Sequence, residues 1–192
     1  YVFQAKIGNG AFGTVYRAVH SYTGATFAVK EIHKLGKQSL REPAILQSLS
    51  HRNIVKFIEF ISMDQDNTMI VMELVHGLNL EILHAQSPFT LDDTRELATE
   101  MLFGLDYLHS NRITHRDLKP ANILVPQRNP IHIKITDFGL AVARSQQLKT
   151  NCGTALYLAP EVLSEACYTN KVDLWSLGVI ALELVLGLPD YP

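Results

Sequence analysis

The sequence predicts an α+β fold in two parts, a small part built mainly of strands and a larger part built mainly of helices. Residues 1–75 carry the alternating apolar pattern of strands, interrupted by turns and by one helical stretch. Residues 76–192 change to helical spacing. The chain has 192 residues, of which 47% are apolar, so it is long enough to bury a core in one or two domains.

Five strands and one helix are expected in the first part. The strands are predicted where apolar residues alternate with polar ones, at residues 1–3, 14–19, 26–32, 54–63 and 69–74. Gly8-Asn9-Gly10 and Tyr22-Thr23-Gly24 mark turns, so the first three strands should form an antiparallel meander. Residues 40–49 have helical spacing, and Ser39 with Glu42 could form a capping box at the start of that helix.

Two long helices dominate the second part. Thr90 and Asp93 have the spacing of a capping box, ahead of a helix whose apolar residues share one face, namely Leu97, Met101, Leu105 and Leu108. Residues 171–186 are apolar on nearly every side, which predicts a helix that is buried all round. Short strands are expected at residues 123–125 and 131–135, on either side of a turn.

The composition argues against several classes of function. The formal net charge of −2 gives no indication of a nucleic acid partner or of an anionic membrane surface. No apolar run reaches the roughly 18 residues that suggest a membrane span. Cys152 and Cys167 are too few for a disulfide framework, which favours a reducing compartment, the cytoplasm or the nucleus.

One short segment holds the side chains that phosphoryl transfer requires. It runs from His115 to Asn122 with the sequence His-Arg-Asp-Leu-Lys-Pro-Ala-Asn, and Asp137-Phe138-Gly139 begins fifteen residues after Asn122. Asp117 can accept the proton of an attacking hydroxyl, whereas Asn122 and Asp137 offer oxygen ligands that suit Mg²⁺. Phosphoryl transfer depends mainly on positioning and on charge neutralisation, and this set of residues provides both.

These two motifs resemble the catalytic loop and the metal-binding loop of the eukaryotic protein kinase family. The resemblance implies a bilobal fold, with a small five-stranded β lobe and one helix at residues 1–75 and a mainly helical lobe at residues 76–192. It implies ATP and Mg²⁺ as cofactors, a protein substrate, Asp117 as the base and Lys119 beside the γ-phosphate. Lys119 is typical of the serine/threonine type, and residues 148–154 loosely resemble calmodulin-dependent and checkpoint kinases.

A glycine-rich loop lies near the start of the chain. Gly8, Gly10, Gly13 and Val15 have a spacing that dinucleotide-binding folds share with kinases. The dinucleotide version needs a helix after the glycines and an acidic residue about twenty positions on, whereas here a strand follows and Lys30 stands twenty-two positions after Gly8. This context argues against an oxidoreductase and favours a loop over ATP phosphates, with Lys30 reaching the α- and β-phosphates.

Glu42 is the ion-pair partner that the resemblance implies for Lys30. The alternative is local, because Glu42 could serve only as the capping-box partner of Ser39. Glu42 follows Lys30 by twelve positions, a shorter spacing than is usual in the family, and Pro43 comes directly after it. Pro43 is tolerable only if the helix begins near Leu40, because a proline inside a helix costs about 3 kcal/mol or more.

The same resemblance assigns the adenine pocket. Met72 is expected as the gatekeeper, and the Glu73 carbonyl and the Val75 amide are expected to bind the edge of the adenine. Apolar residues are expected on either side of the ring, namely Ile7, Val15, Ala28 and Leu124. Each of them alone could equally be a core residue, so the assignment depends on the whole pattern. Asn79 stands where the family often has an acidic contact to the ribose.

A regulatory site is expected in the segment that resembles the family's peptide-positioning loop. Within this segment, Thr154 should form hydrogen bonds near Asp117 and Lys119. An upstream kinase could phosphorylate Thr150, and the added charge of about −1.5 to −2 could bind Arg116 and order the loop. The alternative is that Thr150 is an ordinary loop residue.

The resemblance also implies that the chain is truncated in its large lobe. The family continues with helices that pack around the one at residues 171–186, and without them that helix exposes apolar side chains. The chain alone is therefore expected to be marginally stable and prone to aggregation. Two functions remain open, an active protein serine/threonine kinase and a pseudokinase or truncated kinase-like module that binds nucleotide without turnover. Retention of the catalytic set favours the enzyme.

Overall fold

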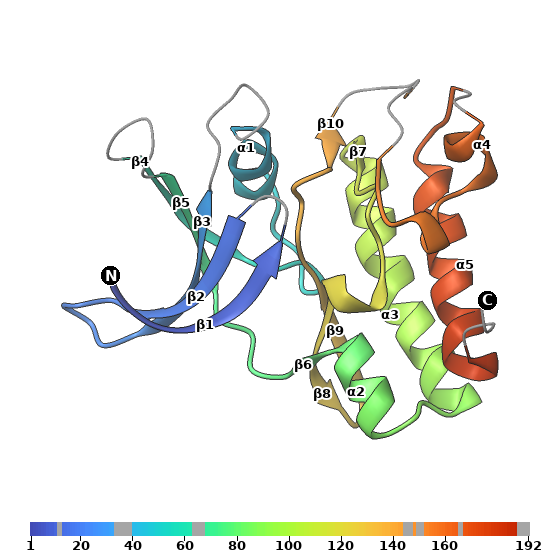
Figure 1. Ribbon diagram of the computed structural model, residues 1–192, viewed down its shortest axis with the longest axis horizontal. Helices are drawn as coiled ribbons and strands as arrows, with labels where there is room; N and C mark the ends of the chain where they lie inside the picture. The colour runs from blue at the N-terminus through green and yellow to red at the C-terminus, as the bar shows by residue number, and fades with distance from the viewer. Residues whose placement is uncertain are drawn as a thin grey trace. The chain divides into compact units, whose positions relative to one another are not determined.

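The chain folds into two compact units, which are described separately. The computed structural model describes residues 1–10, 13–32, 40–62, 68–143, 148, 152–164 and 167–187. One unit comprises residues 1–51 and 55–75, and the other comprises residues 52–54 and 76–192. The first holds a five-stranded sheet and a helix, whereas the second is mainly helical (Figure 1). The predicted α+β class is therefore confirmed.

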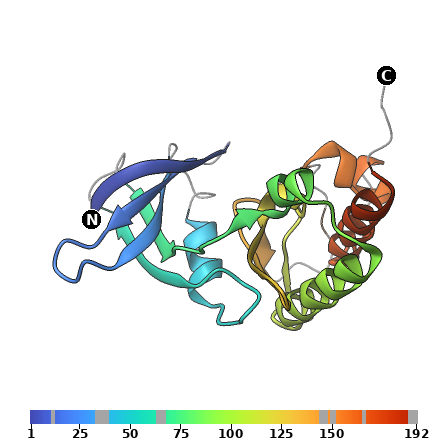
Figure 2. The same ribbon diagram turned by 90° about the horizontal axis from the view of Figure 1, so that it is seen from below.

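The first unit is built on one antiparallel sheet. Its strands, in chain order, are β1 (Val2–Gly10), β2 (Gly13–Val19), β3 (Thr26–Ile32), β4 (Phe57–Ser62) and β5 (Thr68–Glu73). In the sheet they take the order β1-β2-β3-β5-β4, so the first three form the predicted meander. Helix α1 (Arg41–Gln47) lies against one side of the sheet (Figures 1 and 2).

The pairing of the strands separates the two faces of this sheet. Val29 lies opposite Val71 and belongs, with Ala18, to a buried apolar cluster that Tyr1 and Phe27 partly cover. Side chains alternate along a strand, so the residues on either side of Val29 point to the opposite face of the sheet. The face without this cluster therefore carries the side chains of Ala28 and Lys30.

Helix α1 begins at Arg41, one residue later than predicted. Leu40 is the N-cap and makes no side-chain cap hydrogen bond, while Ser39 lies outside the described residues. Pro43 falls in the first turn, where backbone amides have no intrahelical partner, so its missing N–H costs little. The helix thus begins near Leu40, which is the condition under which Pro43 is tolerable.

Helices and small sheets make up the second unit. Its helices are α2 (Leu80–Gln86), α3 (Leu91–Ser110), α4 (Pro160–Leu163) and α5 (Lys171–Leu186), with 3₁₀ turns η1 (Pro120–Asn122) and η2 (Ala155–Tyr157). One sheet joins β6 (Leu78–Asn79), β8 (Ile123–Arg128) and β9 (Ile131–Ile135), and the other joins β7 (Ile113–Thr114) to β10 (Val142–Ala143). Helix α3 packs against both β9 and α5.

Helix α3 matches its prediction closely. The Thr90 hydroxyl accepts a hydrogen bond from the Asp93 amide, and the Asp93 carboxylate accepts one from the Thr90 amide, which completes the capping box. The Thr90 amide is the main reason that the pKa of Asp93 lies below its usual value. The face predicted to be apolar is buried, with Leu97, Met101, Leu105 and Leu108 all at or below 1% exposure.

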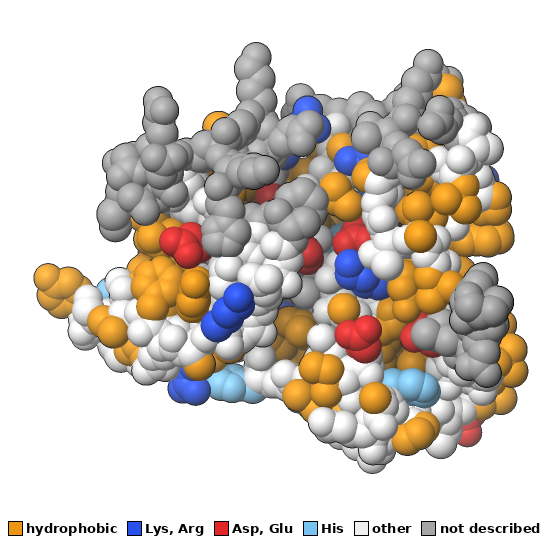
Figure 3. Space-filling model, viewed as in Figure 1, with side chains coloured by type: hydrophobic (Ala, Val, Ile, Leu, Met, Phe, Trp, Pro, Cys, Tyr) orange, Lys and Arg blue, Asp and Glu red, His pale blue; other side chains and the backbone are white. Residues whose placement is uncertain are grey.

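Helix α5 has the predicted bounds, but the prediction that it is buried on every side is wrong. One face packs inward through Val172, Leu177, Ile180 and Leu184. Large apolar side chains on the other face are exposed, namely Leu174, Trp175, Leu182, Val185 and Leu186. Figure 3 shows apolar side chains on the surface over this helix. Among the described residues, no helix has the length and apolar character needed to cross a bilayer.

A short segment between α1 and β4 belongs to the second unit. Arg52 and Asn53 both donate to the Glu100 carboxylate of α3, at 3.0 and 2.8 Å, and the Asn53 carbonyl accepts from the Ile135 amide at 2.8 Å. Burial raises the pKa of Glu100, but the hydrogen bonds from Asn53 and His132 and the charge of Arg52 outweigh burial and hold it below its usual value. These contacts attach residues 52–54 to α3 and β9.

Candidate active site

The first unit contains the ion pair predicted between Lys30 of β3 and Glu42 of α1. Lys30 Nζ lies 2.7 Å from Glu42 Oε1 and 2.8 Å from Oε2, and the two side chains are 7% and 6% exposed. Glu42 lies in the first turn of α1, close to the helix N-terminus, where the helix dipole also favours a carboxylate. The pair therefore holds an ammonium group in a fixed position on one face of the sheet.

The strand register gathers several predicted nucleotide contacts onto that same face. Lys30 lies opposite Val15, and Ala28 lies opposite Met72. Directly opposed residues in an antiparallel sheet share a face, so these four side chains are neighbours. Ala28 and Met72 are buried, whereas Ile7 on β1 is 49% exposed. Their contact with adenine remains a prediction.

The glycines of the loop occupy different positions in the strand pairing. Gly8 lies opposite Val15, whereas Gly10 pairs with Gly13 at the end of the β1–β2 ladder. A Cβ atom on Gly13 would lie 2.0 Å from the Glu31 carbonyl oxygen, so only glycine fits there. The close approach of β2 to β3 thus depends on Gly13.

The side chain of Glu73, at the end of β5, has a structural role. Its carboxylate accepts a hydrogen bond from the Lys56 amide at 2.7 Å, and its own amide donates to the Lys56 carbonyl at 3.0 Å. These bonds hold the end of β5 beside β4. The predicted binding groups, the Glu73 carbonyl and the Val75 amide, belong to the backbone, so this use of the side chain is compatible with them.

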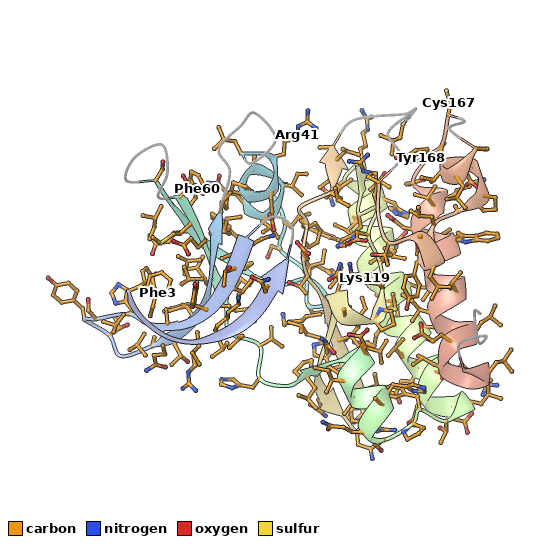
Figure 4. All side chains as sticks on the ribbon, viewed as in Figure 1. Phe3, Arg41, Phe60, Lys119, Cys167 and Tyr168 are labelled. Carbon is orange, nitrogen blue, oxygen red and sulfur yellow. The ribbon has the colours of Figure 1, made fainter. Side chains whose placement is uncertain are left out.

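In the second unit, three polar side chains contact Asp117, namely Asn122, Lys119 and Thr154. Asn122 Nδ2 donates to the Asp117 carbonyl at 2.8 Å and to Oδ2 at 3.2 Å, and Lys119 Nζ lies 3.1 Å from Oδ2. Thr154 Oγ1 donates to Asp117 Oδ1 at 2.8 Å and accepts from Lys119 Nζ at 2.9 Å. Figure 4 labels Lys119, which projects from the loop between β7 and η1. The expected contact of Thr154 is therefore present.

A buried carboxylate fixes the backbone of this loop. Asp173 of α5, which is 0% exposed, accepts from the amides of His115 and Arg116 at 3.0 and 2.9 Å. His109 Nε2 donates to the same carboxylate at 2.8 Å. Arg116 has a φ of 70°, a strained value for a residue with a side chain. Asp173 stabilises that strained backbone and so sets the direction of Asp117.

The segments that carry the predicted metal ligands Asn122 and Asp137 are hydrogen-bonded to each other, and their binding of a hard cation remains a prediction. The Thr136 amide donates to the Asn122 carbonyl at 3.0 Å, and His115 Nε2 donates to the Thr136 carbonyl at 3.0 Å, so the residue before Asp137 is held on both sides. Asn122 uses its Nδ2 on Asp117, which directs its Oδ1 elsewhere. One amide and one carboxylate oxygen fit Mg²⁺, which takes its other ligands from phosphates and water. Asp137 itself has a φ of 62°.

Gly153 brings Thr154 to the base. Its φ is +115°, and a Cβ atom there would lie 2.6 Å from the Arg116 carbonyl oxygen and 2.7 Å from Leu158 Cδ2. We expect Gly153→Ala to lower the free energy of unfolding by about 1–3 kcal/mol and to reduce turnover by displacing Thr154. Urea denaturation and peptide phosphorylation rates measure the two effects. The matched control is Gly178→Ala in α5, where a Cβ meets nothing within 4 Å; equal stability of the two variants would contradict the prediction.

Arg116 already has partners in the structure. Its Nε donates to the Leu140 carbonyl at 2.7 Å, and its Nη1 donates to the Tyr168 hydroxyl at 3.3 Å. Burial raises the pKa of Tyr168. Figure 4 labels Tyr168 beside the segment that leads into α5. Thr150, the predicted phosphorylation site, lies outside the described residues, so its regulation remains a prediction.

The structural role of Asn79 and the supporting roles of His109 and Ser176 were not anticipated from the sequence. Asn79 is the N-cap of α2, because its Oδ1 accepts from the Ile82 amide at 2.9 Å, and it pairs with Leu124 between β6 and β8. His109 and Ser176 support the catalytic segment, the latter by donating to the Tyr157 carbonyl at 2.8 Å. The resemblance placed Asn79 at the ribose position, whereas the signal for its N-cap role is its position before a helical stretch.

Two features define the protein kinase class of phosphotransferases. The β unit has the buried pair of Lys30 and Glu42, and the helical unit has a loop with Asp117, Lys119 and Asn122, followed in sequence by Asp137. The family model described as protein kinase domain matches residues 1–192. The chain therefore belongs to the protein kinase family.

Relatives of this chain carry serine/threonine kinase names. It is 41% identical to serine/threonine-protein kinase TIO of Arabidopsis thaliana, over 96% of this chain and 14% of that protein. It is 39% identical to serine/threonine-protein kinase RAD53 of Saccharomyces cerevisiae, over 97% of this chain and 25% of that protein. With serine/threonine-protein kinase H1 of Homo sapiens the values are 41%, 97% and 46%. The chain thus spans less than half the length of each of these relatives.

Proposed function

We propose that the protein containing this chain transfers the γ-phosphate of ATP to serine or threonine hydroxyls of protein substrates. The observation that carries the proposal is the arrangement around Asp117. Its carboxylate lies 3.1 Å from Lys119 and is contacted by Asn122 and Thr154. A module that only binds nucleotide has no chemical need for this base. The names of the relatives support the same activity.

The residues of the first unit would bind the nucleotide. Val15, Ala28 and Met72 offer apolar contacts for adenine on one sheet face. Ile7 and Leu124 are the further apolar contacts that the family pattern implies. Lys30, held by Glu42, would neutralise charge on the α- and β-phosphates. The backbone of the loop that contains Gly8, Gly10 and Gly13 would approach the phosphates closely because glycines carry no side chain.

The residues of the second unit would perform the transfer. Asn122 and Asp137 would hold Mg²⁺, which supplies neutralisation of phosphate charge when bound. Asp117 would orient the substrate hydroxyl and accept its proton as the oxygen attacks phosphorus. Lys119 would neutralise charge on the transferred group, and its contact with Thr154 would keep it beside Asp117.

This function is tested by measuring which hydroxyl accepts the phosphate and whether the transfer needs Mg²⁺. Full-length protein is incubated with ATP labelled in its γ-phosphate and with three matched peptides that carry Ser, Thr or Tyr at one position. We expect label on the Ser and Thr peptides in the presence of Mg²⁺ and none after chelation. Label on the Tyr peptide alone, or on none of the three while ATP still binds, would contradict the proposal.

We also propose protein substrates, an upstream kinase and a reducing compartment for this protein. Proteins with exposed Ser or Thr residues would be the substrates, and an upstream kinase acting on Thr150 would order the loop through Arg116. We propose no nucleic acid or membrane partner. Cys152 and Cys167 are free thiols, which suits a reducing compartment such as the cytoplasm or the nucleus.

A further inference from the structure

We propose that Tyr168 is a positioning residue, whose hydroxyl holds the Arg116 side chain and thereby helps to set the direction of the Asp117 carboxylate. This inference rests on the proposed function, because it concerns the base of the same reaction. Tyr168 lies in the segment that leads into α5 and is 4% exposed (Figure 4). Arg116 lies 52 positions earlier in the chain, so no local pattern in the sequence indicates the contact.

The guanidinium group of Arg116 is held by two neutral oxygen atoms. Its Nε donates to the Leu140 carbonyl at 2.7 Å, and its Nη1 donates to the Tyr168 hydroxyl at 3.3 Å. Burial is the main reason that the pKa of Tyr168 lies above its usual value, so the hydroxyl keeps its proton and stays neutral. The contact with Tyr168 is therefore a hydrogen bond from a charged donor to a neutral acceptor, which is stronger than one between two neutral groups.

Holding this side chain matters because the backbone of Arg116 is strained. Its φ is 70°, and its amide donates to Asp173 Oδ1 at 2.9 Å. Arg116 directly precedes Asp117, so rotation about the backbone bonds of Arg116 would swing the Asp117 carboxylate away from its partners. Asp173 holds Arg116 through its amide, whereas Tyr168 holds it through its side chain.

The same hydroxyl also reaches the segment that carries Thr154. The Cys152 thiol forms a hydrogen bond with the Tyr168 hydroxyl. The side chains of Arg116, Cys152 and Tyr168 line one small cavity, which shows that the three converge. Tyr168 therefore joins the residue directly before the base to a residue just before Thr154, the hydroxyl that contacts the base.

Tyr168 also has a packing role, which phenylalanine would preserve. Its backbone pairs with that of Leu148 through two hydrogen bonds of 3.0 Å. Its ring belongs to a buried apolar cluster with Leu148, Ala159, Val162 and Val172. Phenylalanine has the same ring and the same backbone groups, so Tyr168→Phe removes only the hydroxyl and separates positioning from packing.

The test measures turnover and nucleotide affinity in the full-length protein. Initial rates of peptide phosphorylation give the turnover number, nucleotide titration gives the affinity for ATP, and thermal unfolding confirms that each variant is folded. We expect Tyr168→Phe to lower the turnover number by about tenfold, as loss of a hydrogen bond to a charged group can. The affinity for ATP should stay unchanged. Tyr22→Phe, at a tyrosine that is 95% exposed, should leave both quantities unchanged.

A second background distinguishes positioning through Arg116 from a general structural effect. In Arg116→Met, Tyr168 has no guanidinium group to hold, so adding Tyr168→Phe should cause no further loss of turnover. If Arg116→Met does not fold, Arg116→Lys serves as the background, because a single ammonium group does not reproduce the fork of donors in a guanidinium group.

Two results would overturn the inference and leave the proposed function intact. The first is natural turnover in folded Tyr168→Phe. The second is an equal fold-loss from Tyr168→Phe in the natural background and in the Arg116 variant, because equal losses indicate that the two residues act independently. Absence of turnover in the natural protein would instead overturn the proposed function together with the inference.

Discussion

Asp117→Asn should lower the turnover number for peptide phosphorylation by about 10²- to 10⁴-fold. Asparagine has the same shape as aspartate but cannot accept the proton of the attacking hydroxyl. Its carbonyl oxygen can still accept one of the hydrogen bonds that Lys119 and Thr154 now make to the carboxylate. We therefore expect the affinity for ATP to stay close to that of the natural protein while turnover falls.

The control for this variant is Asp106→Asn. Asp106 is exposed on α3 and lies outside the loop that carries Asp117, so the change removes the same charge without altering that loop. Initial rates at saturating ATP and peptide, with melting temperatures of all three proteins, separate chemistry from unfolding. If Asp117→Asn kept more than about a tenth of the natural turnover, the assignment of Asp117 as the general base would be wrong.

Breaking the Lys30–Glu42 pair from one side should destabilise the chain by about 3–5 kcal/mol, because a buried charge then loses its partner. Both side chains are at or below 7% exposed. We expect Lys30→Met and Glu42→Gln each to show this loss in urea denaturation. The double variant Lys30→Met with Glu42→Leu should recover most of it, because apolar residues of similar volume replace buried ion pairs at little cost.

Activity should separate from stability in this series. The double variant is expected to fold yet to lose peptide phosphorylation, because Lys30 no longer reaches the phosphates; loss of one such donor typically costs about 10²–10³ in turnover. The exposed pair Arg95–Asp92 on α3, with N···O 2.8 Å and exposures of 71% and 88%, is the control. Its replacement by Met and Leu should change stability by about 1 kcal/mol or less. A double variant of Lys30 and Glu42 with natural turnover would refute the assignment.

Local patterns in the sequence were sufficient to predict much of the fold. The Thr90–Asp93 capping box and the apolar face of α3 depend on contacts within a few residues, so both are readable from spacing. The meander of β1 to β3 follows from alternation and turn residues. The ion pair of Lys30 with Glu42 needed the family pattern, because twelve positions of sequence carry no geometric information about it.

Long-range contacts could not be predicted from the sequence. Apolar spacing in α5 predicted burial on all sides, but spacing cannot say whether a partner covers each face, and Trp175 is 47% exposed. Asn53 belongs with α3 rather than with the sheet because of its bond to Glu100, which is remote in sequence. Similarly, nothing local indicated that His109 supports the carboxylate of Asp173.

We propose that this kinase domain transfers the phosphate of ATP to proteins and does not only bind ATP. The most direct measurement is made on one preparation of the full-length protein, in which ATP binding and the amount of phosphopeptide are determined together. We expect saturable ATP binding and phosphoserine or phosphothreonine peptide in many-fold molar excess over the protein. Stoichiometric ATP binding with no phosphopeptide would contradict it and would identify a nucleotide-binding module.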